Sequence, residues 1–230
     1  MTPTSSAERL NTIGERLGGV RRYLEIGVAK GTTFFAVKAA EKHAVDPRFR
    51  FDPRSRVLQS AERYHPITSD AYFHKAISQE APFDLIFFDG LHTYSQTLRD
   101  FLASQALAHP RTVWLIDDTV PTDAIAADPD LQRVQSARRA DGHPDDQTWM
   151  GDVFKLVAFI DSFCPQFSCF TTEGHGQTVV LPLPQANTEK RFSSLSDIDR
   201  LSYVDVLLLQ DSLLAPTPFD QILAQLERLP

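Results

Sequence analysis

The chain has few cysteines and no long apolar run. Its 230 residues contain only Cys164 and Cys169, too few for a disulfide framework and without the second pair that a zinc site needs. Their apolar neighbours predict buried, reduced thiols. No apolar stretch approaches the roughly 18 residues of a membrane-spanning helix, and the polar start with Glu8 does not fit a secretory signal. We therefore expect a cytoplasmic protein that has no membrane segment.

The chain also lacks an excess of basic charge. It carries 23 Lys and Arg against 30 Asp and Glu, a net charge of −7. Proteins that neutralise phosphates usually show the opposite balance, so we expect no nucleic-acid partner, although a short basic run covers residues 48–56. The composition, 42% hydrophobic and 23% charged, is that of a globular domain with a closed core and excludes a disordered chain.

Neither an internal repeat nor a low-complexity tract divides the chain. Instead, short apolar runs alternate with helical stretches. The clearest run covers residues 84–88, and its continuous apolarity predicts a strand that is covered on both faces, as in a parallel sheet. The expected strands are 23–26, 44–45, 56–58, 64–67, 84–88 and 112–116, and the expected helices are 5–18, 32–42, 71–79, 94–108 and 152–163.

This alternation predicts an α/β fold: a doubly wound, Rossmann-like sheet that is mostly parallel. Residues 166–171 and 178–183 are expected to form an antiparallel hairpin that closes the sheet. We expect one domain over residues 1–190 and a helical extension over residues 191–230. The apolar face of that extension, from Leu201 to Leu214, is expected to belong to the core or to a homodimer surface.

Residues 25–31 (Glu-Ile-Gly-Val-Ala-Lys-Gly) form a turn between an expected strand and an expected helix, where open α/β sheets bind nucleotides. A phosphate-binding P-loop requires Gly-Lys-Ser/Thr, but here Lys30 precedes Gly31. The dinucleotide fingerprint requires G-x-G-x-x-G, but Ala29 replaces the middle glycine. This substitution argues against an oxidoreductase that binds NAD, which we keep as an alternative.

The remaining pattern is E-x-G-x-x-x-G, with Glu25 on the strand and with Gly27 and Gly31 in the turn. Asp46 ends the next strand about 20 residues later, where an acidic side chain can accept hydrogen bonds from both ribose hydroxyls of a nucleotide. The structural alternative is a glycine turn needed only for sheet geometry, with Glu25 as a surface charge.

Three carboxylates follow two buried strands that are neighbours in this fold. Asp89 follows the first strand, and Asp117 and Asp118 follow the second, so the two strand ends lie about 5 Å apart. Carboxylates so close together repel one another unless a cation lies among them, and hard oxygen ligands suit Mg²⁺, Ca²⁺ or Mn²⁺. His92, three residues after Asp89, can accept a proton near neutral pH. Ordinary strand-ending turns and a helix cap are the structural alternatives.

Four segments together resemble one family. Residues 24–33, 83–94, 116–119 and 151–155 resemble a bacterial family of small class I S-adenosylmethionine-dependent methyltransferases. That family is akin to the metal-dependent sugar O-methyltransferases of macrolide biosynthesis and to cephalosporin-hydroxylase-like proteins. The resemblance covers roughly residues 20–185. The helices from Leu195 onward match nothing in it, so the resemblance does not carry the substrate over.

The resemblance implies metal-assisted O-methylation of a hydroxylated small-molecule acceptor, of the sugar or natural-product type. It implies a divalent metal, expected to be Mg²⁺, on Asp89, Asp117 and Asp118, with His92 as the catalytic base. The alternatives are the NAD-binding oxidoreductase and a non-catalytic protein that binds a nucleotide or a partner. Besides the small-molecule acceptor, the partner we expect is a second copy of the chain, in a homodimer through the C-terminal helices. The S-adenosylmethionine residues it implies are Glu25, Gly27, Gly31, Asp46, Ser69, Asp70 and Asp89.

Four further features allow structural interpretations. Asp152 is expected to cap the helix that follows it. Trp149 is expected to be either a lid residue or a core residue. The segment Gly174-His175-Gly176 is expected to form a hairpin tip that faces solvent, with a tip that points at the site as the alternative. Arg138-Arg139 is expected to be an exposed basic pair, with binding of an anionic acceptor as the alternative.

Overall fold

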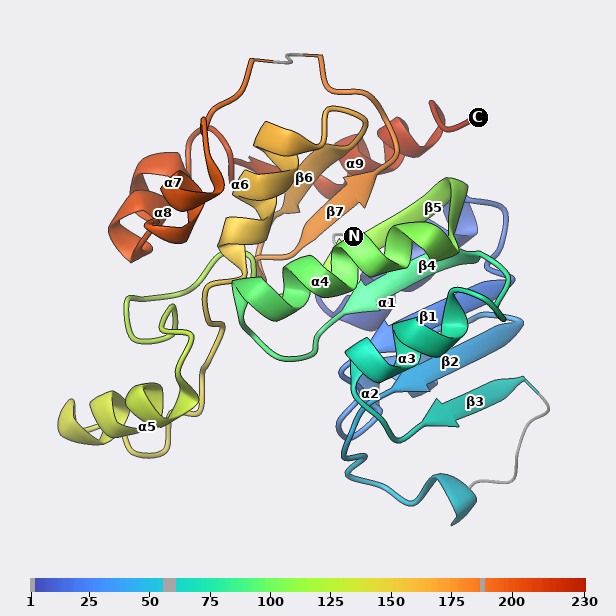
Figure 1. Cartoon of the computed structure of the whole chain (residues 1–230), viewed down its shortest axis with the longest axis horizontal. Helices are drawn as coiled ribbons and strands as arrows, with labels where there is room; N and C mark the ends of the chain where they lie inside the picture. The colour runs from blue at the N-terminus through green and yellow to red at the C-terminus, as the bar shows by residue number, and fades with distance from the viewer. Residues whose placement is uncertain (1–2, 56–60, 187–188) are drawn as a thin grey trace.

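The computed structural model describes residues 3–55, 61–186 and 189–230. Within them the sheet has eight strands in the order β3-β2-β1-β4-β5-β7-β6-β8 (Figure 1). Only β7 runs antiparallel to its neighbours in this described sheet. The mostly parallel, doubly wound sheet with an antiparallel closing hairpin is therefore confirmed. The strands are β1 (Arg22–Ile26), β2 (Glu41–Val45), β3 (Glu62–His65), β4 (Phe83–Phe88), β5 (Ala108–Ile116), β6 (Ser168–Thr172), β7 (Thr178–Leu181) and β8 (Pro216–Thr217).

Helices cover both faces of the sheet (Figure 1). None of the helices in the described part of the chain is long and apolar enough to cross a membrane. Two short 3₁₀ turns accompany the helices, η1 (Pro53–Ser55) and η2 (Gln105–Leu107). The helices are α1 (Ser6–Arg16), α2 (Thr32–Ala36), α3 (Ser69–Ala76), α4 (Tyr94–Ser104), α5 (Leu131–Ala140), α6 (Phe154–Phe163), α7 (Leu195–Asp199), α8 (Tyr203–Leu209) and α9 (Phe219–Leu226).

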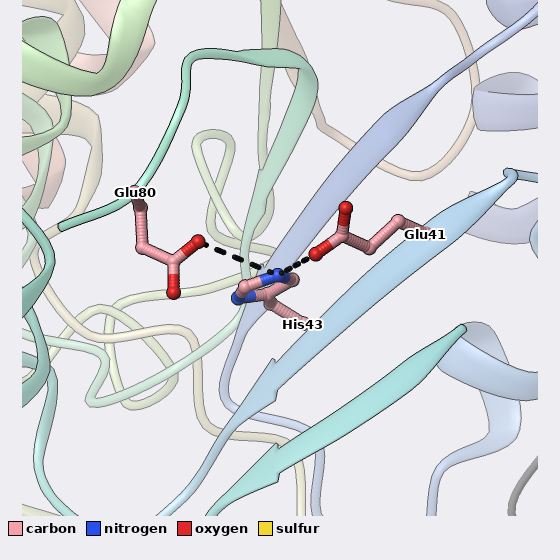
Figure 2. A group of neighbouring side chains, drawn as sticks. All are labelled: Glu41, His43 and Glu80. Carbon is pink, nitrogen blue, oxygen red and sulfur yellow. Dashed lines mark hydrogen bonds and ion pairs between the residues drawn. The ribbon is translucent and has the colours of Figure 1, made fainter. Parts of the chain in front are cut away.

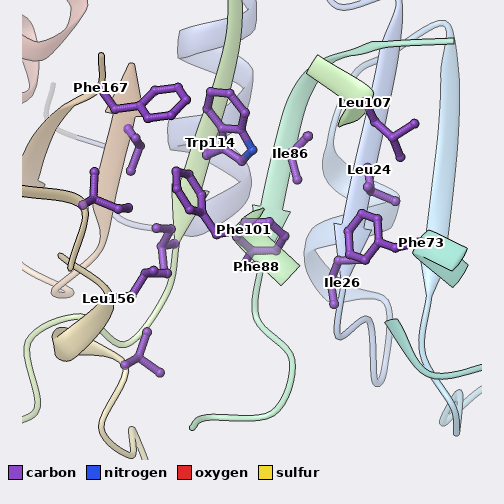
Figure 3. Packing of buried hydrophobic residues seen from close by; sticks show 14 of the residues in the cluster. Leu24, Ile26, Phe73, Ile86, Phe88, Phe101, Leu107, Trp114, Leu156 and Phe167 are labelled. Carbon is purple, nitrogen blue, oxygen red and sulfur yellow. The ribbon is translucent and has the colours of Figure 1, made fainter. Parts of the chain in front are cut away.

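The central strands direct alternate side chains into two apolar cores. On one face, Leu24 and Ile26 of β1 and Phe88 of β4 pack with residues of α3, α4 and α6 (Figure 3). On the other face, Tyr23 and Leu85 pack with residues of α1, α2 and α9. Because successive side chains of a strand point to opposite faces, two cores require apolar residues at consecutive positions. This explains the continuous apolar run of β4.

The predicted helix over residues 32–42 is wrong beyond residue 36. Helix α2 ends at Ala36, because the side chain of Asn11 accepts a hydrogen bond from the Lys38 N–H and donates one to the Ala36 carbonyl. Glu41 then pairs with Arg22 of β1, so the following residues extend as β2. The hydrogen bonds of Asn11 and the parallel pairing with β1 thus override the helical preference of residues 37–42.

Asp152 caps a different helix from the one expected. The N-cap of α6 is Val153, which makes no side-chain capping bond. Asp152 instead accepts a hydrogen bond from the Tyr94 N–H, at 2.7 Å, at the start of α4. Helix α4 also ends earlier than predicted, at Ser104, and β5 already begins at Ala108.

The C-terminal segment adds a strand as well as helices. Strand β8 pairs in parallel with β6, with Thr172 opposite Thr217, and α9 contributes Ile222 to the core that α1 also enters. Helices α7 and α8 lie beside α6, on the side away from α9 (Figure 1). The predicted strand over 56–58 lies outside the described residues, and the predicted domain boundary near residue 190 stays a prediction.

Candidate active site

The glycine turn after β1 permits a close approach between two loops. Gly27 has φ = +88°, and a Cβ atom at this position would lie 2.0 Å from the Asp89 carbonyl oxygen. Gly31 begins α2 with φ = +78°, and a Cβ there would lie 2.2 Å from the ring of Phe35. Both positions therefore require glycine, for conformation and for space. The first brings the ends of β1 and β4 together at the site.

Asp46 fixes the conformation of this turn. Its Oδ2 accepts hydrogen bonds from the N–H groups of Val28 and Ala29, at 3.0 and 2.8 Å, and its Oδ1 accepts one from the Arg48 N–H at 2.6 Å. Ala29 has φ = +45°, a left-handed conformation that is uncommon for alanine. The carboxylate at the end of β2 thus holds the strained backbone of the glycine turn.

A cavity of about 900 Å³ lies over the carboxyl ends of β1, β2 and β4. This volume is in the range of pockets that bind cofactors or drug-sized ligands. Helix α5 stands away from the sheet on the side toward which the parallel strands run (Figure 1), and its Leu131 and Gln135 line the cavity. Five of the predicted site residues also line it: Gly27, Asp46, Ser69, Asp89 and His92.

The other predicted cofactor residues lie away from this cavity. Asp70 is exposed and pairs with Arg99, and Gly31 forms the start of α2. Glu25 is only 1% exposed and accepts a hydrogen bond from the Tyr23 hydroxyl at 2.5 Å. Its burial raises the pKa of Glu25 to about 8. Direct contacts of these three residues with a cofactor stay predictions.

The predicted acidic cluster is assembled by β4 and β5, which are adjacent in the sheet. Asp117 and Asp118 are buried, and with Asp89 and His92 they line a small recess beside the cavity. Burial and the nearby charges of Asp117 and Asp118 raise the pKa of Asp89. Asp118 has φ = +59°, the kind of backbone strain that concentrates at functional sites.

His92 joins this cluster in a way that suits a cation. Its Nδ1 lies 2.5 Å from Asp118 Oδ2, and its Nε2 lies 3.9 Å from Asp89 Oδ1. The Nδ1 atom is buried, yet among the described residues it has no hydrogen-bond partner with acceptable geometry. A buried ring nitrogen without a hydrogen bond, facing carboxylate oxygens, is a donor set that fits a divalent metal ion.

His175 lies beside the acidic cluster, a position that the sequence allowed but did not favour. Its Nε2 lies 3.0 Å from Asp117 Oδ1, and this contact raises the pKa of His175. The side chain is half exposed, but the expectation of a tip directed only to solvent was wrong. Nothing in the local pattern relates His175 to a carboxylate 58 residues earlier in the chain, so the signal comes only from the pairing of β5 with β7.

Trp149 forms part of the cavity wall and stacks on His92, with ring centroids 4.9 Å apart. Gly151 allows this approach, because a Cβ there would lie 1.6 Å from the His92 carbonyl oxygen. Arg138 is buried and forms ion pairs with Asp123 and Asp146, so the expectation of an exposed basic pair was wrong for Arg138.

A second group of possible metal ligands lies at the opposite ends of the strands. Glu41, His43 and Glu80 converge there (Figure 2). The guanidinium group of Arg22 already lies among them, 2.6 Å from Glu80 and within 3.1 Å of both Glu41 and His43. An arginine at this position supplies the positive charge, so this cluster is a structural ion-pair network and has no place for a metal ion.

A family model described as a methyltransferase domain matches residues 24–119. This part of the chain is thus similar to a methyltransferase domain. No curated protein matches the chain. The matched region contains the glycine turn, Asp46, Asp89, His92 and the Asp117-Asp118 pair, whereas Trp149 and His175 lie beyond it.

Solved methyltransferases share the architecture of this chain. The chain is similar to the O-methyltransferase TomG from Streptomyces achromogenes, solved with S-adenosylmethionine, with a TM-score of 0.52 and 20% identity over 78% of this chain and 81% of that one. It is also similar to an O-methyltransferase from Bacillus cereus in complex with S-adenosylhomocysteine, with a TM-score of 0.50 and 16% identity over the same shares. These similarities confirm the class I methyltransferase fold.

Proposed function

We propose that the protein is an S-adenosylmethionine-dependent O-methyltransferase that acts on a hydroxylated small molecule of the sugar or natural-product type. One observation carries this proposal. The same cavity is lined by the glycine turn and Asp46 and also by Asp89 and His92. A donor held by the turn and an acceptor held beside His92 would therefore meet in one cavity, and positioning of two reactants supplies much of the rate in such reactions.

The donor side would be held by the turn from Gly27 to Gly31, by Asp46 and by Ser69. A carboxylate offers about four acceptor positions, and three on Asp46 already accept backbone N–H groups. One position therefore remains for a ribose hydroxyl. Ser69 is 8% exposed and accepts a hydrogen bond from Gln96, and both residues line the cavity. The adenine would lie against Ser69.

On the acceptor side, His92 would take the proton of the reacting hydroxyl while Trp149 holds the imidazole in place. Asp89, Asp117 and Asp118 would hold a divalent cation, in the first instance Mg²⁺. When bound, such an ion lowers the pKa of a hydroxyl group that it contacts. Asp118 would also orient His92 through their 2.5 Å contact.

A thermal-shift titration tests the proposal first. Purified protein is titrated with S-adenosylhomocysteine and with NAD, each in the presence of Mg²⁺ or EDTA. At 100 times its dissociation constant, S-adenosylhomocysteine is expected to stabilise the fold by about 2.7 kcal/mol, or roughly 5–10 °C. Stabilisation by NAD alone would overturn the proposal in favour of an oxidoreductase.

Transfer of a labelled methyl group from S-adenosylmethionine to a panel of phenols, catechols and sugars then tests the reaction. Binding of S-adenosylhomocysteine without transfer to any acceptor in the panel would favour a non-catalytic nucleotide-binding protein. With an acceptor in hand, His92→Ala is expected to retain donor binding and lose turnover. Turnover that is indifferent to EDTA would remove the cation from the proposal.

We also propose that the protein is cytoplasmic. A second proposal is that it forms a homodimer through its C-terminal helices. Val204, Leu207 and Leu208 are 48–76% exposed and lie on one face of α8, with Leu195 of α7 52% exposed nearby in sequence. Exposed apolar faces of this kind are typical of interaction surfaces. Light scattering of the wild type and of Leu208→Glu is the test, and a monomeric wild type would overturn the dimer.

A further inference from the structure

We propose that His175 is a ligand of the cation held at Asp117 and Asp118, and that this nitrogen ligand makes the site selective for a first-row transition ion over Mg²⁺. The inference rests on the cation site of the proposed function and specifies which class of ion that site prefers. Asp117, Asp118 and His175 each offer a ligand atom, and these atoms lie within 4.8 Å of one another. His175 approaches from the β6–β7 hairpin, whereas His92 reaches Asp118 from the loop before α4.

The hairpin tip is built to hold this histidine in place. The carbonyl oxygen of His175 accepts hydrogen bonds from Arg9 Nη1 at 3.2 Å, from Thr172 Oγ1 at 3.1 Å and from the Gln177 N–H at 2.7 Å. Arg9 is only 2% exposed. A backbone position fixed by three donors, one of them a buried arginine, is not a free loop tip.

Arg9 directs its hydrogen bonds to the tip, and its charge acts on Asp117 only from beyond ion-pair distance. Its guanidinium group also donates to the Glu173 carbonyl at 2.9 Å and to Gln177 Oε1 at 2.7 Å. Within the described residues, no Lys or Arg forms an ion pair with Asp89, Asp117 or Asp118. Their ion-pair partners there are the two histidines alone.

Among the described residues, three carboxylates without a Lys or Arg ion pair, and with Arg9 acting on Asp117 only from further away, leave an excess of negative charge. Asp117 and Asp118 are 8% and 7% exposed, so water screens this charge poorly. A divalent cation would compensate it, and arginine occupies the corresponding position in the Glu41–His43–Glu80 group. The contrast between the two clusters points to an ion at the first.

The ligand chemistry indicates the kind of ion, and the contact distance is compatible with an ion bound by both residues. Two adjacent ligands of an octahedral ion, each about 2.1 Å from it, lie about 3.0 Å apart. His175 Nε2 and Asp117 Oδ1 are 3.0 Å apart. Mg²⁺ prefers oxygen ligands, whereas imidazole nitrogen suits first-row transition ions. A mixed set of carboxylate oxygen and imidazole nitrogen therefore favours ions from Mn²⁺ to Zn²⁺.

Pulsed electron paramagnetic resonance on the Mn²⁺-loaded protein tests this assignment, because it detects nitrogen bound directly to the ion. We expect nitrogen coupling in the wild type and a clear fall in its amplitude in His175→Gln. His92→Gln is the matched control, since it removes the other imidazole, and we expect it to keep the His175 coupling. Unchanged amplitude in His175→Gln, or no nitrogen coupling in the wild type, would overturn the inference.

Affinity measurements separate this inference from the function on which it rests. His175→Gln is expected to weaken Mn²⁺ binding at least tenfold and to reduce the ratio of Mn²⁺ affinity to Mg²⁺ affinity. The affinity for S-adenosylhomocysteine should stay unchanged, which also shows that the variant is folded. Equal Mn²⁺ affinities of the variant and the wild type would overturn only the inference about His175. If the wild type binds no Mn²⁺, both the inference and the cation of the proposed function are overturned. The thermal-shift titration then still tests independently whether the protein binds S-adenosylhomocysteine.

Discussion

The imidazole of His92 lies almost parallel to the indole of Trp149, with the ring centroids 4.9 Å apart and the planes inclined by 19°. The indole is itself anchored, because its Nε1 donates a hydrogen bond to the Asp128 carbonyl at 2.9 Å. His92 is thus held on one side by an aromatic face and on the other by the 2.5 Å contact with Asp118. In the proposed mechanism Trp149 is a positioning residue for the base.

Trp149→Ala should therefore lower kcat for methyl transfer about three- to tenfold, because a stacked aromatic pair contributes about 0.5–1.5 kcal/mol. Trp149→Phe keeps a ring over His92 and should restore most of the rate. The measurement is kcat and KM for an acceptor found by the labelled-methyl screen, at saturating donor. Equal losses in the two variants would show that stacking is not the cause.

Gly27→Ala should destabilise the fold by at least about 3 kcal/mol, because the new Cβ meets backbone and the residue keeps a left-handed conformation. Gly18 is the matched control: it has the same φ of +88°, but nothing lies within 4 Å of its Cβ position. Gly18→Ala should cost only the conformational strain, about 1–2 kcal/mol. Urea denaturation measures both, and equal losses would remove the role assigned to the Asp89 contact.

Asp46→Asn should weaken S-adenosylhomocysteine binding tenfold or more. An amide has one acceptor oxygen, whereas both oxygens of Asp46 accept backbone N–H groups in the structure. One donor would then face another, and the glycine turn would lose its anchor. Asp70→Asn, at an exposed position outside the cavity, should change the affinity less than twofold. Isothermal titration decides, and a large loss in Asp70→Asn would instead support the contact expected from the sequence.

Local patterns were sufficient for the sheet and for much of the candidate site. The apolar run of β4 predicts a central strand, and strand order then brings Asp89 beside Asp117 and Asp118. Gly27 was recognisable because the turn requires a residue without a side chain. Each of these inferences depends on residues that are close in sequence or on ends of strands that are adjacent in every sheet of this topology.

The errors concern contacts between distant segments. Asn11 of α1 ends α2, and Asp152 caps α4 across 58 residues. His175 and Trp149 reach the site only through the folded arrangement of the hairpin and of the segment after α5. No local periodicity encodes such contacts, so tertiary structure decides them.

Glu25 should make stability fall as the pH rises. Its pKa is about 8 in the folded protein because burial disfavours the charged form, against 4.5 as the ordinary value. Between these values the folded state binds one more proton than the unfolded state. The free energy of unfolding therefore falls by up to about 5 kcal/mol as the pH rises from about 4.5 to about 8, and it levels off above that. Glu25→Gln cannot ionise and should remove this slope, whereas Glu15→Gln, at an exposed position, should keep it. Urea denaturation from pH 5 to 9 measures the difference, and parallel curves for wild type and Glu25→Gln would show that Glu25 is already charged when folded.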